Sequence, residues 1–372
     1  MRIFVVILCL LMSANTALGQ ITADKPNNLL PVEFCRGYVI VQVTLQSEAA
    51  SLSAAERTLD FIYDTGAARS YVDPDSIRRV SGVTVKSGQR AIIRNASAGP
   101  VTFKKLPARV KEMDAFSGAL GRRIDGILAY GAFKDVLLTI DYPNAEVSIA
   151  SYAPLPKPDN RAVFSTRHTW RDRRPYLDVH FADDTRRMLI DSGAGTSFGL
   201  RNLGKYATTA NPVVLRQSLR INRYEDIRGA RLSDDARIGA FTFVEPIVEE
   251  YEKTELIGYD VLKHFSWTFD QKKRRVLIRK GNSQDITFDS VTNIGAKMRA
   301  VEGGIRIDEI IKNGAADRAS LLAGDLISNI NGEPVLTRGC KSLNDEMSTS
   351  SYTIVRNGTR FDIAIDALQV IE

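Results

Sequence analysis

The chain contains an internal repeat, and this duplication constrains its fold more than any other feature of the sequence. Residues 125–149 align without a gap onto residues 254–278. The aligned segments share these identical pairs: Tyr130/Tyr259, Lys134/Lys263, Thr139/Thr268, Asp141/Asp270, Val147/Val276 and Ile149/Ile278. Self-similarity of this length indicates two copies of one structural unit.

A second repeated segment lies upstream in each copy. The sequence FIYDTGAARSYV at 61–72 corresponds to MLIDSGAGTSFG at 188–199, and both place Asp-(Thr/Ser)-Gly-Ala after three largely apolar residues. Residues 38–45 and 176–181, which precede these loops, alternate between apolar and polar. Such alternation is typical of antiparallel strands with one buried face. The two copies therefore agree in order and spacing as well as in residue type.

Residues 36–281 resemble a bilobal aspartic protease of the pepsin and retropepsin superfamily, in its compact bacterial form. The resemblance rests on the paired Asp-(Thr/Ser)-Gly-Ala loops and on the apolar pairs that follow them, Ile127-Leu128 and Leu256-Ile257. It implies a mainly β fold with two pepsin-like, retropepsin-type β-barrel lobes. The expected bounds are residues 36–152 for lobe 1, 153–161 for a proline-rich linker and 162–281 for lobe 2.

The resemblance implies that Asp64 and Asp191 form the catalytic dyad of an endopeptidase. Two carboxyl groups a few ångström apart do not both ionise, so the pair holds one proton, as is established for aspartic proteases as a class. The ionised member takes a proton from the water that attacks the peptide carbonyl, and the protonated member hydrogen-bonds the carbonyl oxygen. This chemistry requires no cofactor and no metal.

By the same resemblance, four loop residues support the dyad: Thr65, Gly66, Ser192 and Gly193. Their hydroxyl groups are expected to bond to the opposite loop, and the glycines let the loops approach without a Cβ in the way. Ala67 and Ala194 occupy positions where pepsin-like enzymes often have Ser or Thr, whose hydroxyl can stabilise the charged carboxylate. We therefore expect an activity optimum less acidic than that of pepsin.

Two features of the resemblance stay open. The first copy has Ala129 where the second has Gly258, and family members usually keep Gly at this position of close loop packing. A catalytically weak or inactive pseudoprotease that binds polypeptides is therefore the alternative function. A flap over the cleft is expected from the family, and the hairpin around residues 94–103 is the candidate, with an ordinary surface turn as the alternative.

The stretch GTSFG at 195–199 also fits the G-x-S-x-G elbow of a serine hydrolase, with Ser197 as the nucleophile. That elbow needs a strand that runs into its first glycine, a helix after the serine and a His base. The apolar run instead ends before Asp191, and the first copy has Ala68 and Val72 in place of the elbow glycines. The duplication favours the Asp-centred pattern, and Ser197 is interpreted as a structural residue.

Residues 288–368 resemble a PDZ domain of the bacterial protease-associated kind. The segment NGAADRASLLAGDLISNINGEPV at 313–335 fits that family's core: a helix with small residues, Gly-Asp, a short apolar strand and an Asn-Gly turn. The resemblance implies that a peptide with a free C-terminus adds as a strand beside residues 305–311. The backbone of Gly303, Gly304 and Ile305 would hold its carboxylate. A packing module that binds no ligand is the alternative.

The first 19 residues predict a secretory signal peptide, because a basic start and a short apolar run precede small residues. The run is shorter than the roughly 20 apolar residues that span a bilayer, so no stable membrane insertion is expected after cleavage. We expect a periplasmic or secreted protein. Whether residues 20–35 are a propeptide, and whether Cys35 and Cys340 pair, stays open from the sequence.

The net charge of +6 comes from dispersed residues. Its densest basic patch, at 167–176, is interpreted as solvated surface, so no nucleic-acid partner is expected. His168 and His180 lack metal-ligand spacing. The expected partners are polypeptide substrates, with C-termini as candidates for binding at the PDZ domain. Because both Asp loops lie in one chain, a monomer is expected.

Overall fold

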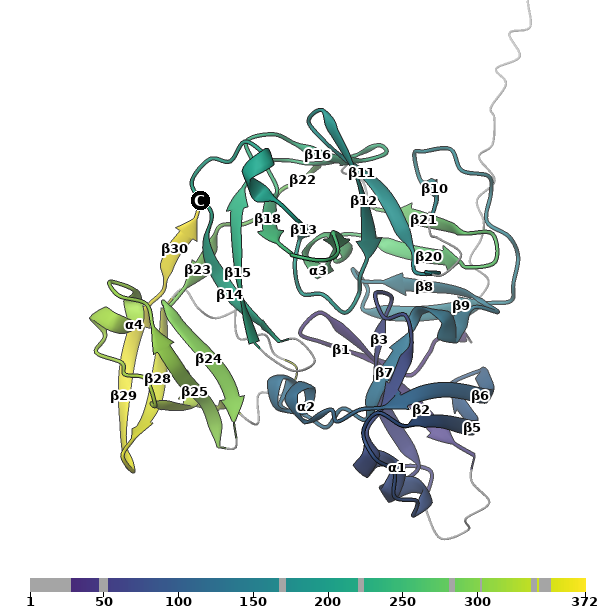
Figure 1. Cartoon of the computed structure of the whole chain (residues 1–372), viewed down its shortest axis with the longest axis horizontal. Coiled ribbons are helices and arrows are strands. Elements are labelled where there is room, and N and C mark those ends of the chain that lie inside the picture. Colours follow the sequence, from purple (N-terminus) through teal and green to yellow (C-terminus); the bar gives the residue numbers. More distant parts are fainter. Residues whose placement is uncertain are drawn as a thin grey trace, which may run out of the picture.

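The computed structural model describes residues 28–46, 53–166, 172–219, 224–280, 285–301, 303–335, 340 and 349–372. The predicted signal peptide at 1–19 lies outside the described residues, as do residues 20–27 of the predicted N-terminal segment 20–35. What is described is mainly β, with barrel-like sheets and a few short helices (Figure 1). The predicted fold class is confirmed at this level.

The first copy of the repeat forms a seven-stranded sheet. In spatial order it contains β1 (Val32–Cys35), β2 (Tyr38–Leu45), β3 (Thr58–Asp64), β7 (Gly126–Ala129), β4 (Ser70–Val72), β6 (Val101–Val110) and β5 (Arg90–Ala98). A further pairing between β2 and β5 curls the sheet back on itself. Between the strands lie α1 (Pro74–Ser81), α2 (Asp114–Leu120) and the 3₁₀ helix η2 (Tyr130–Phe133).

Local sequence signals explain the bounds of helix α1. The Asp73 side chain accepts a hydrogen bond from the Ser76 backbone N–H, and Pro74 occupies the first helical position, where no N–H is needed. Gly82 ends the helix with φ 70°, a left-handed conformation that glycine adopts without strain. The helix therefore begins directly after the short strand β4.

The second copy forms a ten-stranded sheet. In spatial order it contains β14 (Val213–Leu219), β15 (Tyr224–Arg231), β18 (Ile247–Glu250), β13 (Phe198–Leu200), β19 (Leu256–Ile257), β12 (Asp184–Ile190), β11 (Tyr176–Phe181), β16 (Ala236–Ile238), β17 (Phe241–Phe243) and β22 (Asp285–Ile286). The short helices η3 (Leu203–Lys205) and α3 (Tyr259–Leu262) accompany it.

Both copies share one unusual pattern of strand pairing. The strand that leads into the Asp loop, β3 or β12, pairs in parallel with the strand that carries the apolar pair, β7 or β19. The short strand after the loop, β4 or β13, pairs antiparallel with that same strand. The sequence repeat therefore corresponds to a repeat of topology.

A five-stranded sheet joins the two copies. Its spatial order is β10 (Val163–Ser165), β21 (Arg275–Arg279), β20 (Ser266–Asp270), β8 (Leu137–Asp141) and β9 (Glu146–Ala150). In the central antiparallel pair, Thr139 lies opposite Thr268, and their hydroxyl oxygens are 2.8 Å apart. Because these two residues are equivalent in the repeat, their contact marks a local two-fold axis. One cluster of buried apolar side chains runs through both copies and the joining sheet.

Residues after 290 form a separate unit with its own apolar core. One sheet contains, in spatial order, β24 (Ala296–Val301), β25 (Gly304–Ile310), β26 (Leu326–Ile330), β28 (Thr349–Arg356) and β29 (Thr359–Asp366), with β27 (Glu333–Pro334) beside β26. Helix α4 (Ala315–Arg318) precedes β26, and β23 (Val291–Asn293) pairs with β30 (Leu368–Ile371). Asn357 and Gly358, both at positive φ, form the predicted turn between β28 and β29.

This C-terminal unit is attached to both copies. A disulfide joins Cys340 to Cys35 of the first copy, with a Cα–Cα distance of 4.3 Å, which answers the question that the sequence left open. Lys297 on β24 forms a 2.7 Å ion pair with Asp226 on β15 of the second copy. Strand β24 also contacts α2 and β14 (Figure 1).

Candidate active site

The two Asp loops meet between the copies. The side chains of Asp64 and Asp191 hydrogen-bond to each other. A Cβ added to Gly66 would lie 2.3 Å from the Asp191 Cγ, and a Cβ added to Gly193 would lie 2.6 Å from the Asp64 Cγ. Each glycine thus lies directly against the carboxyl group of the other loop. Only glycine fits there, because any side chain would overlap that carboxyl group.

The two loop hydroxyl groups cross-link the loops symmetrically. Thr65 Oγ1 donates to the Ile190 carbonyl at 2.7 Å and accepts from the Ser192 N–H at 2.9 Å. In the opposite direction, Ser192 Oγ donates to the Tyr63 carbonyl at 2.9 Å and accepts from the Thr65 N–H at 3.0 Å. Both side chains are buried. The structure therefore places Thr65, Gly66, Ser192 and Gly193 around the Asp pair, as the sequence predicts.

The environment of the Asp pair favours one shared proton. Burial raises the pKa of Asp64 well above its usual range, and the neighbouring Asp191 charge and hydrogen bond raise this pKa further. Hydrogen bonds from the backbone N–H groups of Gly66 and Ala67 act in the opposite direction. Asp191 accepts the equivalent bond from the Gly193 N–H at 3.0 Å. Because the two groups interact directly, the proton belongs to the pair.

The two copies fasten their loops differently at Ala129 and Gly258. A Cβ on Gly258 would lie 2.4 Å from the Thr196 carbonyl oxygen, so the second copy requires glycine there. In the first copy, the Ala129 N–H instead donates to the Ser70 hydroxyl at 3.0 Å. The methyl group of Ala129 is buried without separating Asp64 from its partner. The departure from the family pattern is therefore a local difference in loop packing.

Ser197 does not lie in a nucleophile elbow. Strand β12 ends at Ile190, and strand β13 rather than a helix follows Ser197. The Ser197 side chain is 3% exposed, and within the described part of the chain its hydroxyl has no hydrogen-bond partner. The His264 ring packs edge-on against Phe265 and Phe288. The structure thus supports the structural interpretation of Ser197.

The hairpin predicted as a flap is formed by β5 and β6, but its tip is not free. A Cβ on Gly99 would lie 3.0 Å from Pro31 and 3.3 Å from the Leu29 carbonyl oxygen. This N-terminal segment is itself bound to the joining sheet, since the Leu30 N–H donates to the Val147 carbonyl. The prediction that this hairpin covers the cleft is therefore wrong. A contact between the two copies is instead made by strand β14 of the second copy, which contacts α2 of the first.

Arg174, which no sequence motif singles out, lies beside the Asp pair. Its Nη1 donates to the Gly66 carbonyl at 2.8 Å, and its other nitrogens bond to Asp172 and Tyr176. The sequence analysis assigned this residue to solvated basic surface. One sequence feature could have identified Arg174: it lies just before strand β11, and β11 pairs with β12, the strand that leads to Asp191.

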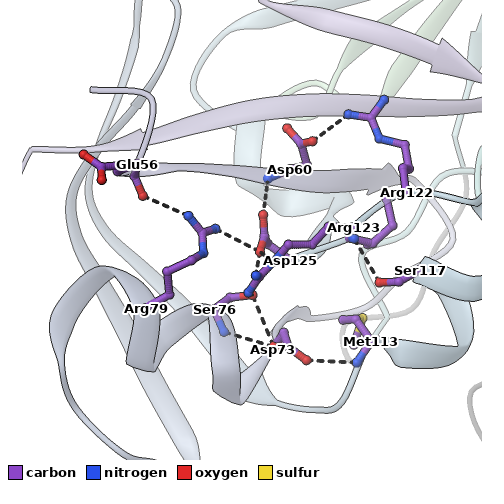
Figure 2. A network of polar contacts seen from close by, with 11 residues as sticks. Glu56, Asp60, Asp73, Ser76, Arg79, Met113, Ser117, Arg122, Arg123 and Asp125 are labelled. Carbon is purple, nitrogen blue, oxygen red and sulfur yellow. Dashed lines mark hydrogen bonds and ion pairs between the residues drawn. The ribbon is translucent and has the colours of Figure 1, made fainter. Parts of the chain in front are cut away.

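A second group of buried charges supports the first copy (Figure 2). Asp125, 3% exposed, lies directly before β7 and accepts from the Asp60 N–H, the Ser76 hydroxyl, Arg79 and Arg123. These bonds lower its pKa although burial acts against them. Every partner belongs to the same copy, so the network fixes β3, α1 and β7 together rather than forming a second site.

The predicted peptide site of the C-terminal unit needs correction. Strand β25, which contains most of residues 305–311, is paired on both sides, with β24 and with β26. Because β24 pairs along its length and β26 pairs with Ile305 and Arg306, the predicted strand addition beside this segment is wrong. Gly303, Gly304 and Ile305 lie at the turn into β25, and a Cβ on Gly304 would lie 2.2 Å from the Ile327 carbonyl oxygen. The end strands of this sheet are β24 and β29.

Two kinds of feature are absent from the described ranges of the chain. These residues contain no group of three or more His, Cys, Asp or Glu side chains that could hold a metal ion. They also contain no helix that is both long and apolar enough to cross a membrane. His168 lies outside the described residues, and the His180 ring bonds to the Thr185 hydroxyl.

No protein-family profile matches this chain, and no curated protein matches it. The HtrA3 PDZ domain bound to a phage-derived ligand (FGRWV) is similar to part of the chain: the match has 22% identity and a TM-score of 0.20 and covers 22% of this chain and 89% of that one. A PDZ domain protein from Parabacteroides distasonis ATCC 8503 matches at 18% identity with a TM-score of 0.19 and covers 22% of this chain. This match spans 21% of that protein's length.

Proposed function

We propose that the chain is an aspartic endopeptidase of the bilobal, pepsin-like type, with residues 36–152 and 162–281 as its lobes. The observation that carries the proposal is the Asp64–Asp191 pair: two hydrogen-bonded carboxyl groups, of which Asp64 has a raised pKa, held by loops that cross-link each other. A pair of aspartates that only capped turns would not need glycine on both sides of the contact.

The geometry suits activation of water. The ionised carboxyl group takes a proton from a water molecule as its oxygen attacks the peptide carbonyl carbon, and the protonated partner hydrogen-bonds the carbonyl oxygen. When the tetrahedral intermediate collapses, the C–N bond breaks and the leaving amine takes a proton from the pair. The cross-links through Thr65 and Ser192 hold the carboxyl groups in place, so little reorganisation is needed.

The proposal includes export by the signal peptide, a monomeric state and a C-terminal unit that recruits polypeptides as a PDZ domain does. For this unit we place strand addition at β24, since β24 is an end strand of its sheet whereas β25 lies between β24 and β26. The attachment of this unit to both copies through Cys35–Cys340 and Lys297–Asp226 supports a role of the unit together with the two lobes.

Cleavage of a mixed peptide library by the mature protein tests the proposal. Wild type should cleave, Asp64→Asn and Asp191→Asn should each lose at least about 10³-fold in rate, and a statine inhibitor of the pepstatin type should block wild type. Ser197→Ala is the matched control and should retain activity, because this buried hydroxyl contacts no described partner.

The same experiment separates the pseudoprotease alternative. Equal turnover in wild type and Asp64→Asn, or none in either, would exclude the endopeptidase. Peptide binding without turnover would then favour the polypeptide-binding protein.

A further inference from the structure

We propose that Arg174 is a positioning residue for the Asp64–Asp191 pair: it reaches from the second copy to the loop of the first and holds Gly66 against Asp191. This inference rests on the proposed function, and it adds to the pair a residue that has no equivalent in the loop motif.

The contact with the loop is direct. Arg174 Nη1 donates to the Gly66 carbonyl oxygen at 2.8 Å. Gly66 is the residue whose Cα lies against the Asp191 carboxyl group, as the 2.3 Å distance from an added Cβ shows. The backbone N–H of Gly66 also donates to Asp64 Oδ1 at 2.7 Å. A displacement of this one residue therefore moves groups that touch both carboxyls.

The guanidinium is held rigidly on its other sides. Nε and Nη2 bond to the two carboxylate oxygens of Asp172 at 2.9 and 2.6 Å. Nη2 also donates to the Tyr176 hydroxyl, which in turn donates to Asp172 Oδ2 at 2.9 Å. Arg174 and Asp172 are only 23% and 26% exposed. The three side chains thus bond to one another, and Arg174 Nη1 donates to the Gly66 carbonyl.

The charge states of this set are fixed at neutral pH. Hydrogen bonds from Arg174 lower the pKa of Asp172 to about 2, and burial together with the bond to Asp172 raises the pKa of Tyr176 to about 12. Asp172 is therefore a carboxylate and Tyr176 a neutral hydroxyl across the working range. The Asp172 charge offsets most of the guanidinium charge, so the main effect on the pair is positional.

Lysine does not replace arginine in this geometry. The planar guanidinium presents several donors in a fixed arrangement, and here it serves a carboxylate, a hydroxyl and a carbonyl at once. A lysine retains the charge but lacks that arrangement. Arg174→Lys therefore keeps the positive charge at this site while it removes the fixed arrangement of hydrogen-bond donors.

Strand register explains why this residue lies at the pair. The Pro175 carbonyl accepts from the Ile190 N–H at 2.9 Å, so Arg174 lies beside Asp191. In the first copy, Val39 lies opposite Tyr63, which places Tyr38 beside Asp64. The duplicated sheet thus has an arginine on one side and a tyrosine on the other, and the cation breaks the local two-fold symmetry.

The test compares Arg174→Lys, Arg174→Gln and the double variant Asp172→Asn/Arg174→Gln with wild type. The control is Arg186→Lys, because Arg186 is 22% exposed and forms a two-bond contact with Glu255 in the same copy, away from the Asp loops. Measurements are kcat and KM as a function of pH, the melting temperature, and titration of the Asp64 and Asp191 carboxyls by NMR with ¹³C-labelled aspartate.

Among the described residues, the titratable and charged groups around the pair include Asp172, Arg174, Tyr176, Tyr63, Tyr142 and Tyr38. Arg174→Lys should lower kcat about 10–100-fold with KM changed less than about threefold, as expected when reacting groups are misplaced. Arg174→Gln should also raise the pKa values of the pair, because a cation is lost while Asp172 remains charged. The double variant should reverse that pKa shift but not the loss in kcat.

Arg186→Lys should leave both kcat and the titration unchanged. If Arg174→Lys and Arg174→Gln keep wild-type kcat and titration curves, or only lower the melting temperature, the proposal is overturned. If wild type cleaves no peptide, the endopeptidase proposal fails on its own, and the titration still tests the role of Arg174. A shifted titration of the Asp pair in Arg174→Gln would support the coupling between Arg174 and the pair. An unchanged titration would overturn it.

Discussion

Replacing Thr65 by valine tests whether the loop cross-link stabilises the lobes. Valine has a similar shape but neither donates to the Ile190 carbonyl nor accepts from the Ser192 N–H. Thr65 is fully buried, so water cannot satisfy these groups. Each buried polar group left without a partner costs about 1–3 kcal/mol, which gives about 2–6 kcal/mol for the two. For a body of this size, the melting temperature should fall by roughly 5–20 °C.

The assay is differential scanning calorimetry of wild type, Thr65→Val and Thr65→Ser, with peptidase activity measured on the same samples. Thr65→Ser keeps the hydroxyl and should recover most of the lost stability. Thr139→Val is the matched control: it removes only the hydroxyl contact with Thr268, on a half-buried sheet position, and should cost about 1 kcal/mol or less. A Thr65→Val protein that melts with wild type and keeps its activity would refute the role given to the cross-link.

Three further predictions follow from the structure. Gly66→Ala should abolish peptide cleavage, because its Cβ would overlap the Asp191 carboxyl group, whereas Gly131→Ala, with nothing within 4 Å of the added Cβ, should cleave like wild type. Asp125→Asn should lower the free energy of unfolding by about 2–4 kcal/mol at pH 7. Because the pKa of Asp125 is depressed in the folded state, its stabilising contribution is present above the unfolded carboxyl pKa and is lost as the pH falls through the folded pKa. The melting temperature of the variant should therefore depend less on pH in the acid range than that of wild type. Replacing both cysteines of the Cys35–Cys340 disulfide, which closes a separation of 305 residues, should lower the melting temperature, and a reductant should then have no further effect; an unchanged melting temperature would contradict the stabilising role.

Much of the architecture could be predicted because the sequence contains an internal repeat. A single Asp-Thr-Gly loop is a common turn, but two loops in register with a second repeated segment constrain each other. The same logic identified Thr139 and Thr268, which the structure places opposite each other between the copies. It also separated Ser197 from the Asp pattern, since the glycines around it occur in one copy only.

The wrong predictions share one cause: the order of strands in a sheet cannot be predicted from short segments of sequence. The hairpin at 94–103 carries a normal turn signal, yet its tip packs on residues 29–31, which lie far from it in the sequence. Residues 305–311 look like an edge strand only until β24 is seen to pair with them. Arg174 belongs to a run of basic residues, and only the register of β11 against β12 places it beside the Asp pair.

The sequence by itself therefore determined the duplication, the β class, the two Asp loops that should meet and a separate C-terminal unit with its Asn-Gly hairpin. These features are set by local patterns or by comparison of the chain with itself. Only the tertiary structure decided that Cys35 pairs with Cys340, that β24 rather than β25 lies at an end of its sheet, and that Arg174 donates to Gly66. Each of these depends on contacts between residues far apart in the chain, whose geometry follows from sheet order and packing rather than from the residues on either side.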